Sequence, residues 1–180
     1  MRSEAMFYIG QCFHMKGRVL GNEVTGFVWL DHGYWPHALD WKEYRVFNEI
    51  QLFWEVFGNE YEDGTIEWGQ LCCGTRGFTW GAVLDAKGAV ALSTDVKTAV
   101  DHDTDEWVTK ALFDLGGQQW QFESEPDGWL RQFSSARWGG YRAQCGITKL
   151  RGDKRKPKLS FTWMEGFSGR TRAQKLPPVR

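Results

Sequence analysis

Most of the chain consists of short segments in which apolar and polar residues alternate. The clearest segment is 44–57, where Ile50, Leu52, Trp54 and Val56 fall on one face and polar or aromatic residues fall on the other. Successive side chains of a strand point to opposite sides, so a period of two over this length predicts a strand. A chain built mainly from such segments must fold as a sheet protein.

Similar segments recur at a spacing of roughly 8 to 12 residues, separated by turn signals such as Asp63-Gly64 and Gly116-Gly117. The expected strands cover residues 5–14, 23–31, 44–57, 65–73, 78–84, 89–101, 106–115, 118–125, 141–148 and 159–167, with 16–22 as a further strand or a turn. We find no convincing amphipathic helix. The pattern predicts an all-β fold of about ten strands, either a single antiparallel barrel or a strongly curved sandwich. A closed barrel would remove exposed strand edges.

A chain of 180 residues is long enough for one domain with its own core. We expect residues 1–167 to form the barrel and residues 168–180, which are basic and contain Pro177-Pro178, to form a disordered tail. The apolar runs are shorter than a membrane span requires, and residues 1–6 lack the layout of a signal peptide. We therefore expect a cytoplasmic protein.

The stretch Gly26 to His37 places an acid and an imidazole, Asp31 and His32, at the end of an aromatic strand pattern. One interpretation is that Asp31 accepts backbone hydrogen bonds in a turn and that His32 faces the solvent. The alternative is that Trp29, Tyr34 and Trp35 surround Asp31 and raise its pKa, so that it can exchange a proton with an apolar ligand. In that case Asp31 would be the catalytic acid, assisted by His32 and Tyr34.

Several other kinds of site are not supported. The acidic run 101–106 begins like a calcium loop but has Glu106 where the loop needs glycine. The histidines and four cysteines show no metal-ligand spacing, so we expect neither a metal site nor a disulfide framework. The basic segment 149–158 could contact phosphates, yet residues 1–148 carry a net charge of −9, which would repel a nucleic acid. We therefore expect no nucleic-acid partner.

Three groups of residues carry a resemblance to a known family. Gly26, Asp31-His32 and Pro36 lie as in the stretch G-x-G-x-R-D-H-S-W-G-P-R of proteins similar to hydroxyneurosporene synthase, the carotenoid 1,2-hydratase group. The run Gly77 to Val90, which includes Trp80, and the segment Phe161 to Phe167, which includes Glu165, look like the second half of those proteins. The resemblance spans about residues 8 to 167.

This resemblance implies a lipocalin-like β-barrel that corresponds to one of two barrels, so a second lipocalin-like domain or a homodimer is an expected partner. It also implies a hydratase that protonates a carbon–carbon double bond of an isoprenoid, adds water and needs no cofactor. The expected ligand-binding residues combine aromatic faces with two polar groups: Trp29, Trp35, His37, Trp54, Trp80 and Glu165.

Three hypotheses follow. The chain is an enzyme that hydrates or isomerises an apolar isoprenoid, polyketide or steroid-like molecule without a cofactor. Alternatively it is a carrier that holds such a molecule without reaction, or, third, an interaction scaffold that uses its basic tail.

Overall fold

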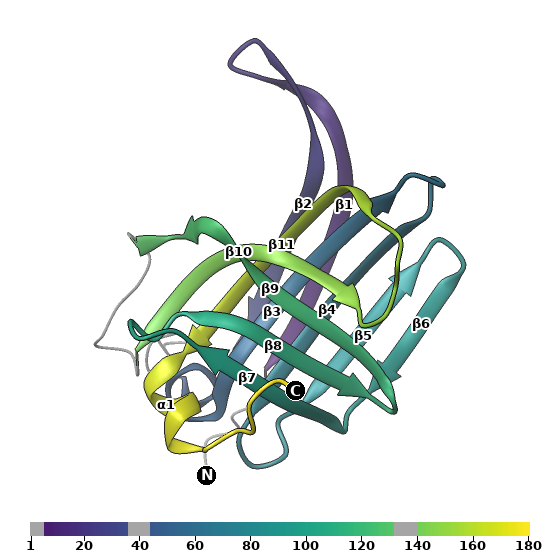
Figure 1. Ribbon diagram of the computed structural model, residues 1–180. Coiled ribbons are helices and arrows are strands. Elements are labelled where there is room, and N and C mark those ends of the chain that lie inside the picture. The colour runs from purple at the N-terminus through teal and green to yellow at the C-terminus, as the bar shows by residue number, and fades with distance from the viewer. Residues whose placement is uncertain (1–5, 36–43, 132–139) are drawn as a thin grey trace.

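A computed structural model describes residues 6–35, 44–131 and 140–180 and shows an almost entirely β protein (Figure 1). Nine antiparallel strands form one sheet in the order β6-β5-β4-β3-β11-β10-β9-β8-β7, and β1 pairs only with β2. The strands are β1 (Phe7–Val19), β2 (Asn22–Tyr34), β3 (Gln51–Tyr61), β4 (Ile66–Gly74), β5 (Trp80–Asp85), β6 (Gly88–Ser93), β7 (Val96–His102), β8 (Val108–Leu115), β9 (Gln118–Trp129), β10 (Tyr141–Leu150) and β11 (Pro157–Phe167). The predicted all-β fold is confirmed.

The nine-stranded sheet curves into a nearly closed barrel whose edge strands are β6 and β7. The barrel interior is filled by side chains that are almost completely buried, among them Phe53, Phe57, Phe113, Trp120 and Phe122. The Cys73 Sγ atom lies 3.1 Å from the Thr98 hydroxyl and so joins β4 to β7 across the interior. Burial of large aromatic rings supplies much of the free energy that favours this closure.

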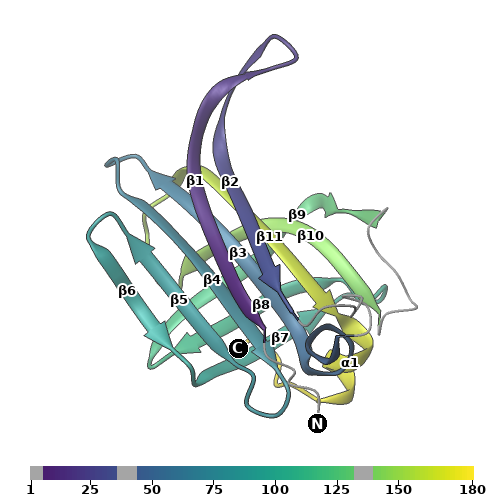
Figure 2. The same ribbon diagram turned by 180° about the vertical axis from the view of Figure 1, so that it is seen from behind.

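The strands β1 and β2 form a long hairpin that lies against the outside of the barrel wall (Figure 2). Leu20 and Gly21 connect them, and both have positive φ (50° and 82°), as a two-residue hairpin turn requires. Phe27 is the buried anchor of the hairpin and packs over Gly58 of β3, where a Cβ atom would lie 2.6 Å from the ring. The end of the hairpin at which β1 turns into β2 projects beyond the barrel.

Several predicted elements differ in their bounds. The strand expected over 5–14 and the further strand or turn expected over 16–22 form a single strand, β1, which ends at Val19. The strand expected over 44–57 begins only at Gln51, the first residue of β3, because apolar and polar residues alternate regularly only from about Ile50 onward. The preceding residues Val46–Ile50 form a short π-helix. The strand expected over 89–101 is two strands, since the Ser93 hydroxyl accepts the Asp95 N–H and turns the chain. The strand expected to end at residue 125 continues to Trp129 in β9, where Asp127 has positive φ and the pairing with β10 shifts register.

Residues 168–180, for which composition predicts disorder, lie along the barrel. Helix α1 (Ser168–Ala173) follows β11 directly. The Arg170 guanidinium donates to the Gln51 carbonyl at 2.8 Å, and the Val179 N–H donates to Asp101 at 3.1 Å. Leu176 packs against the core. Local composition missed these contacts because they involve strands distant in the sequence. In the described ranges no helix has both the length and the apolar character needed to cross a membrane.

Candidate functional site

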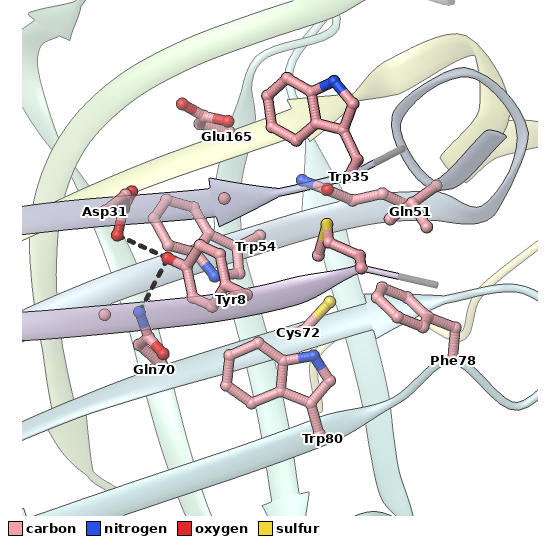
Figure 3. Close-up of a pocket in the computed structure, with 14 residues that line it drawn as sticks. Tyr8, Asp31, Trp35, Gln51, Trp54, Gln70, Cys72, Phe78, Trp80 and Glu165 are labelled. Carbon is pink, nitrogen blue, oxygen red and sulfur yellow. Dashed lines mark hydrogen bonds between the residues drawn. The ribbon is translucent and has the colours of Figure 1, made fainter. Parts of the chain in front are cut away.

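A pocket of about 520 Å³ lies between the hairpin and the outer wall of the barrel, which places it outside the filled barrel interior. Its walls include the aromatic residues Trp35, Trp54, Phe78 and Trp80 and the polar residues Tyr8, Gln51, Gln70, Asp31 and Glu165 (Figure 3). A volume of this size is in the range that small-molecule sites occupy, and an aromatic wall with a few polar groups is typical of such sites.

The floor of the pocket is one row of side chains across four strands. Register places Glu165 of β11 beside Trp54 of β3, Trp54 beside Cys72 of β4, and Cys72 beside Trp80 of β5. Side chains alternate between the two faces of a strand, so Phe53 and Cys73 point into the barrel while this row points out. The wall is therefore buried on both faces where the hairpin covers it.

The hairpin supplies the cover, and its register leaves space beneath it. Tyr8 pairs with Gly33 and Asp31 pairs with Gly10, so each of these two side chains has a glycine opposite it. A Cβ atom at Gly10 would overlap the Gln70 side chain. The two glycines therefore allow Tyr8 and Asp31 to share a narrow space above the floor.

A chain of hydrogen bonds crosses the pocket from the floor to the cover (Figure 3). The Gln70 amide donates to the Tyr8 hydroxyl at 3.0 Å, and that hydroxyl donates to Asp31 Oδ1 at 2.5 Å. Burial raises the pKa of Tyr8, and its hydrogen bond to Asp31 raises it further. The phenol is thus a fixed donor, and Asp31 is its acceptor.

Both carboxyl groups of the pocket have a raised pKa. Burial raises the pKa of Asp31, and the hydrogen bond from Tyr8 offsets this only in part. Although Asp31 is exposed as a residue, its carboxyl points into the pocket. Burial also raises the pKa of Glu165; the Trp163 indole, which donates at 2.9 Å, lowers it, and the charge of Asp31 raises it. Two carboxyls whose ionisation is disfavoured mainly by burial can hold a proton beside an apolar ligand.

The structure brings five of the predicted site residues together in this pocket: Asp31, Trp35, Trp54, Trp80 and Glu165. It does not bring His32 and Tyr34 to Asp31, because alternation along β2 places both on the opposite face of the hairpin, where Tyr34 is 57% exposed. Trp29 shares the inward face but does not line the pocket. The remaining predicted site residue, His37, lies outside the described residues.

Sequence reasoning missed Tyr8 and Gln70, and one signal could have found the first. If the hairpin turn is centred on Leu20-Gly21, strict pairing brings Tyr8 to the same face as Asp31. The sequence held no comparable signal for Gln70, because the docking of the hairpin on β4 depends on contacts between residues that are far apart in the sequence. Among the residues that the structure describes, no three His, Cys, Asp or Glu side chains group as metal ligands.

No protein-family model and no curated protein sequence matches the chain. Among solved structures, the fold matches the crystal structure of a protein from Nitrosomonas europaea that is provisionally named AttH. The two share 17% sequence identity and a TM-score of 0.53, over 91% of this chain and 52% of that chain. The chain therefore spans about half the length of this neighbour. The likeness shows the fold alone, a nearly closed antiparallel β-barrel.

Proposed function

We propose that the protein binds an apolar small molecule in the pocket between the hairpin and the barrel wall. The observation that carries this proposal is the combination in one pocket of four aromatic side chains with the linked polar groups Tyr8, Asp31 and Gln70. The aromatic faces would bury the apolar body of a ligand, and the polar groups would bind a single hydroxyl or carbonyl. The resemblance to carotenoid hydratases favours an isoprenoid over a polyketide or a steroid.

Replacing Trp54 by alanine is expected to weaken the binding of farnesol or progesterone by about 10- to 100-fold, since a large part of the apolar floor is lost. Quenching of tryptophan fluorescence measures the affinity. The matched control is Trp129→Ala, an indole that stacks on Trp107 and does not line the pocket. Equal affinities of the wild type and Trp54→Ala, or equal losses in both variants, would contradict the assignment of the pocket.

We further propose that the ligand undergoes acid–base chemistry at Asp31, either hydration of a double bond or its isomerisation, without a cofactor. The specific observation in favour is that two carboxyls with raised pKa, Asp31 and Glu165, line the same pocket and that Asp31 accepts a hydrogen bond from the Tyr8 hydroxyl. In hydration, Asp31 would donate its proton to one carbon of the double bond, and the water that adds to the other carbon would return a proton to Asp31. Tyr8 would take the assisting role that was expected of Tyr34. A carrier function is the alternative, in which the same groups only hold the ligand.

If Asp31 is the acid, Asp31→Asn is expected to lower turnover of an isoprenoid alkene by about 100-fold or more and to leave its affinity within a few fold. Product analysis by mass spectrometry measures turnover, and fluorescence quenching measures affinity. The control is His32→Gln, on the opposite face of β2, which is expected to change neither. A parallel loss of turnover and affinity in Asp31→Asn would assign Asp31 to positioning only, and wild-type protein that binds without turnover would identify a carrier.

A further inference from the structure

The face of the hairpin that points away from the barrel is apolar and carries no formal charge. Cross-strand partners share a face, so β1 and β2 contribute alternate residues to it. Its members include six exposed apolar or aromatic side chains: Phe7, Ile9, Phe13, Met15, Leu30 and Tyr34. No Asp, Glu, Lys or Arg of either strand lies on this face, and its one ionisable imidazole is His32. We refer to it as the outer hairpin face.

The charged residues of the hairpin lie instead on the face that is turned toward the barrel. These are Lys16, Arg18, Glu23 and Asp31, and Arg18 pairs with Glu23 at 3.1 Å near the projecting end. A two-stranded ribbon that was covered on one side only would normally place its charges on the solvent side and its apolar residues on the covered side. Here the solvent side is the less polar one. Among the described residues nothing covers it.

We propose that the outer hairpin face is the contact surface of a homodimer, in which two copies of the chain pack these faces against each other. A two-fold interface buries the same patch on both copies, so any formal charge on it would lose its water twice, and this face has none. Its Phe, Tyr and Met side chains are the types enriched in protein interfaces. A lipid surface is less well matched, because the basic residues Lys16 and Arg18 lie on the other face.

The size of the face sets the strength of the dimer. Each strand has 13 residues, so the ribbon is about 43 Å long at ~3.3 Å per residue. With a width of about 12 Å the face offers about 500 Å² per copy, below the ~800 Å² per partner of a standard stable interface. The dimer is therefore expected to be reversible and to form in the micromolar range or above.

Sedimentation velocity over protein concentrations from low to several hundred micromolar tests the proposal. The chain of 20.8 kDa is expected to shift reversibly toward twice that mass as concentration rises. Leu30→Lys, at a position 46% exposed, would bury an ammonium group on each side of the contact and is expected to move the midpoint at least 10-fold upward. The matched control is Leu92→Lys in β6, an exposed leucine away from the hairpin, which is expected to leave the midpoint unchanged.

Two outcomes would overturn the proposal. The first is a wild-type protein that stays monomeric throughout, or a dimer that Leu30→Lys and Leu92→Lys affect equally. The second is a monomer that floats with phosphatidylcholine vesicles and loses this binding in Leu30→Lys, which would assign the outer hairpin face to lipid. Far-ultraviolet circular dichroism confirms that each variant is folded. Leu30 does not line the pocket, so ligand quenching reports separately on the proposed function.

Discussion

Replacing Glu55 by glutamine is expected to make the free energy of unfolding markedly less dependent on pH between about pH 5 and pH 8. Glu55 lies inside the barrel with no exposed surface. The Thr148 hydroxyl donates to its Oε1 atom at 3.1 Å, and its Oε2 atom has no partner among the described residues. Burial raises the pKa of Glu55 from 4.5 to about 8, and the hydrogen bond from Thr148 offsets this only in part.

The direction of the effect follows from which state holds the proton. Below pH 4.5 the carboxyl is protonated in both the folded and the unfolded chain. Between 4.5 and about 8 only the folded chain keeps the proton, so each unit of pH increase favours the unfolded chain by about 1.4 kcal/mol. The free energy of unfolding should therefore be highest at the acidic end of this range and fall by about 5 kcal/mol across it.

Urea unfolding at a series of pH values measures this slope for the wild type and for Glu55→Gln. The glutamine side chain has a similar shape and no ionisation, so the variant should be the more stable protein above about pH 8. The control is Glu62→Gln, an exposed carboxylate in the turn after β3, which should keep the wild-type slope. Parallel slopes in the wild type and Glu55→Gln would show that another group carries the pH dependence.

Replacing Gly58 by valine is expected to release the hairpin from the barrel and abolish ligand binding. A Cβ atom at this position would lie 2.6 to 3.0 Å from three atoms of the Phe27 ring, the buried anchor of the hairpin. The new side chain points away from the interior, so the barrel itself should stay folded. A two-stranded hairpin without a supporting surface is marginally stable in water, so β1 and β2 should lose their structure together with the pocket cover.

Limited proteolysis within residues 7–34 and fluorescence quenching by farnesol measure the two consequences. Gly26→Val is the matched control, since a Cβ atom at Gly26 meets nothing within 4 Å. A double variant with Phe27→Ala makes room for the valine and should recover part of the docking, which a double-mutant cycle quantifies. A Gly58→Val protein that resists proteolysis and binds farnesol like the wild type would contradict this account of the hairpin.

The fold class could be predicted because it depends on local patterns. Alternation and turn signals are properties of neighbouring residues, and they located most strands to within a few residues. The errors lie where distant contacts decide the structure. Val46–Ile50, which belong to the strand expected over 44–57, form a short π-helix, and the end of the chain is ordered by Gln51 and Asp101, which are far away in the sequence.

The site could be predicted only in part, for the same reason. Asp31 and the aromatic residues Trp54 and Trp80 were identifiable by chemical type. The partners of Asp31 were not, because neighbours in sequence such as His32 alternate to the other face while Tyr8, 23 positions earlier, lies in contact. Strand pairing determines which side chains meet, and a sequence shows pairing only where a turn is recognised.

The pocket is assembled from segments that are synthesised far apart in time. The cover, β1 and β2, leaves the ribosome long before Glu165 of β11, which completes the floor beside Trp54. Until β11 pairs with β3, the ribbon has no finished wall to dock on, and both of its faces must remain in contact with water or with a chaperone. The pocket is therefore among the last parts of the molecule to form, and under the proposed function ligand capture during translation should not precede barrel closure.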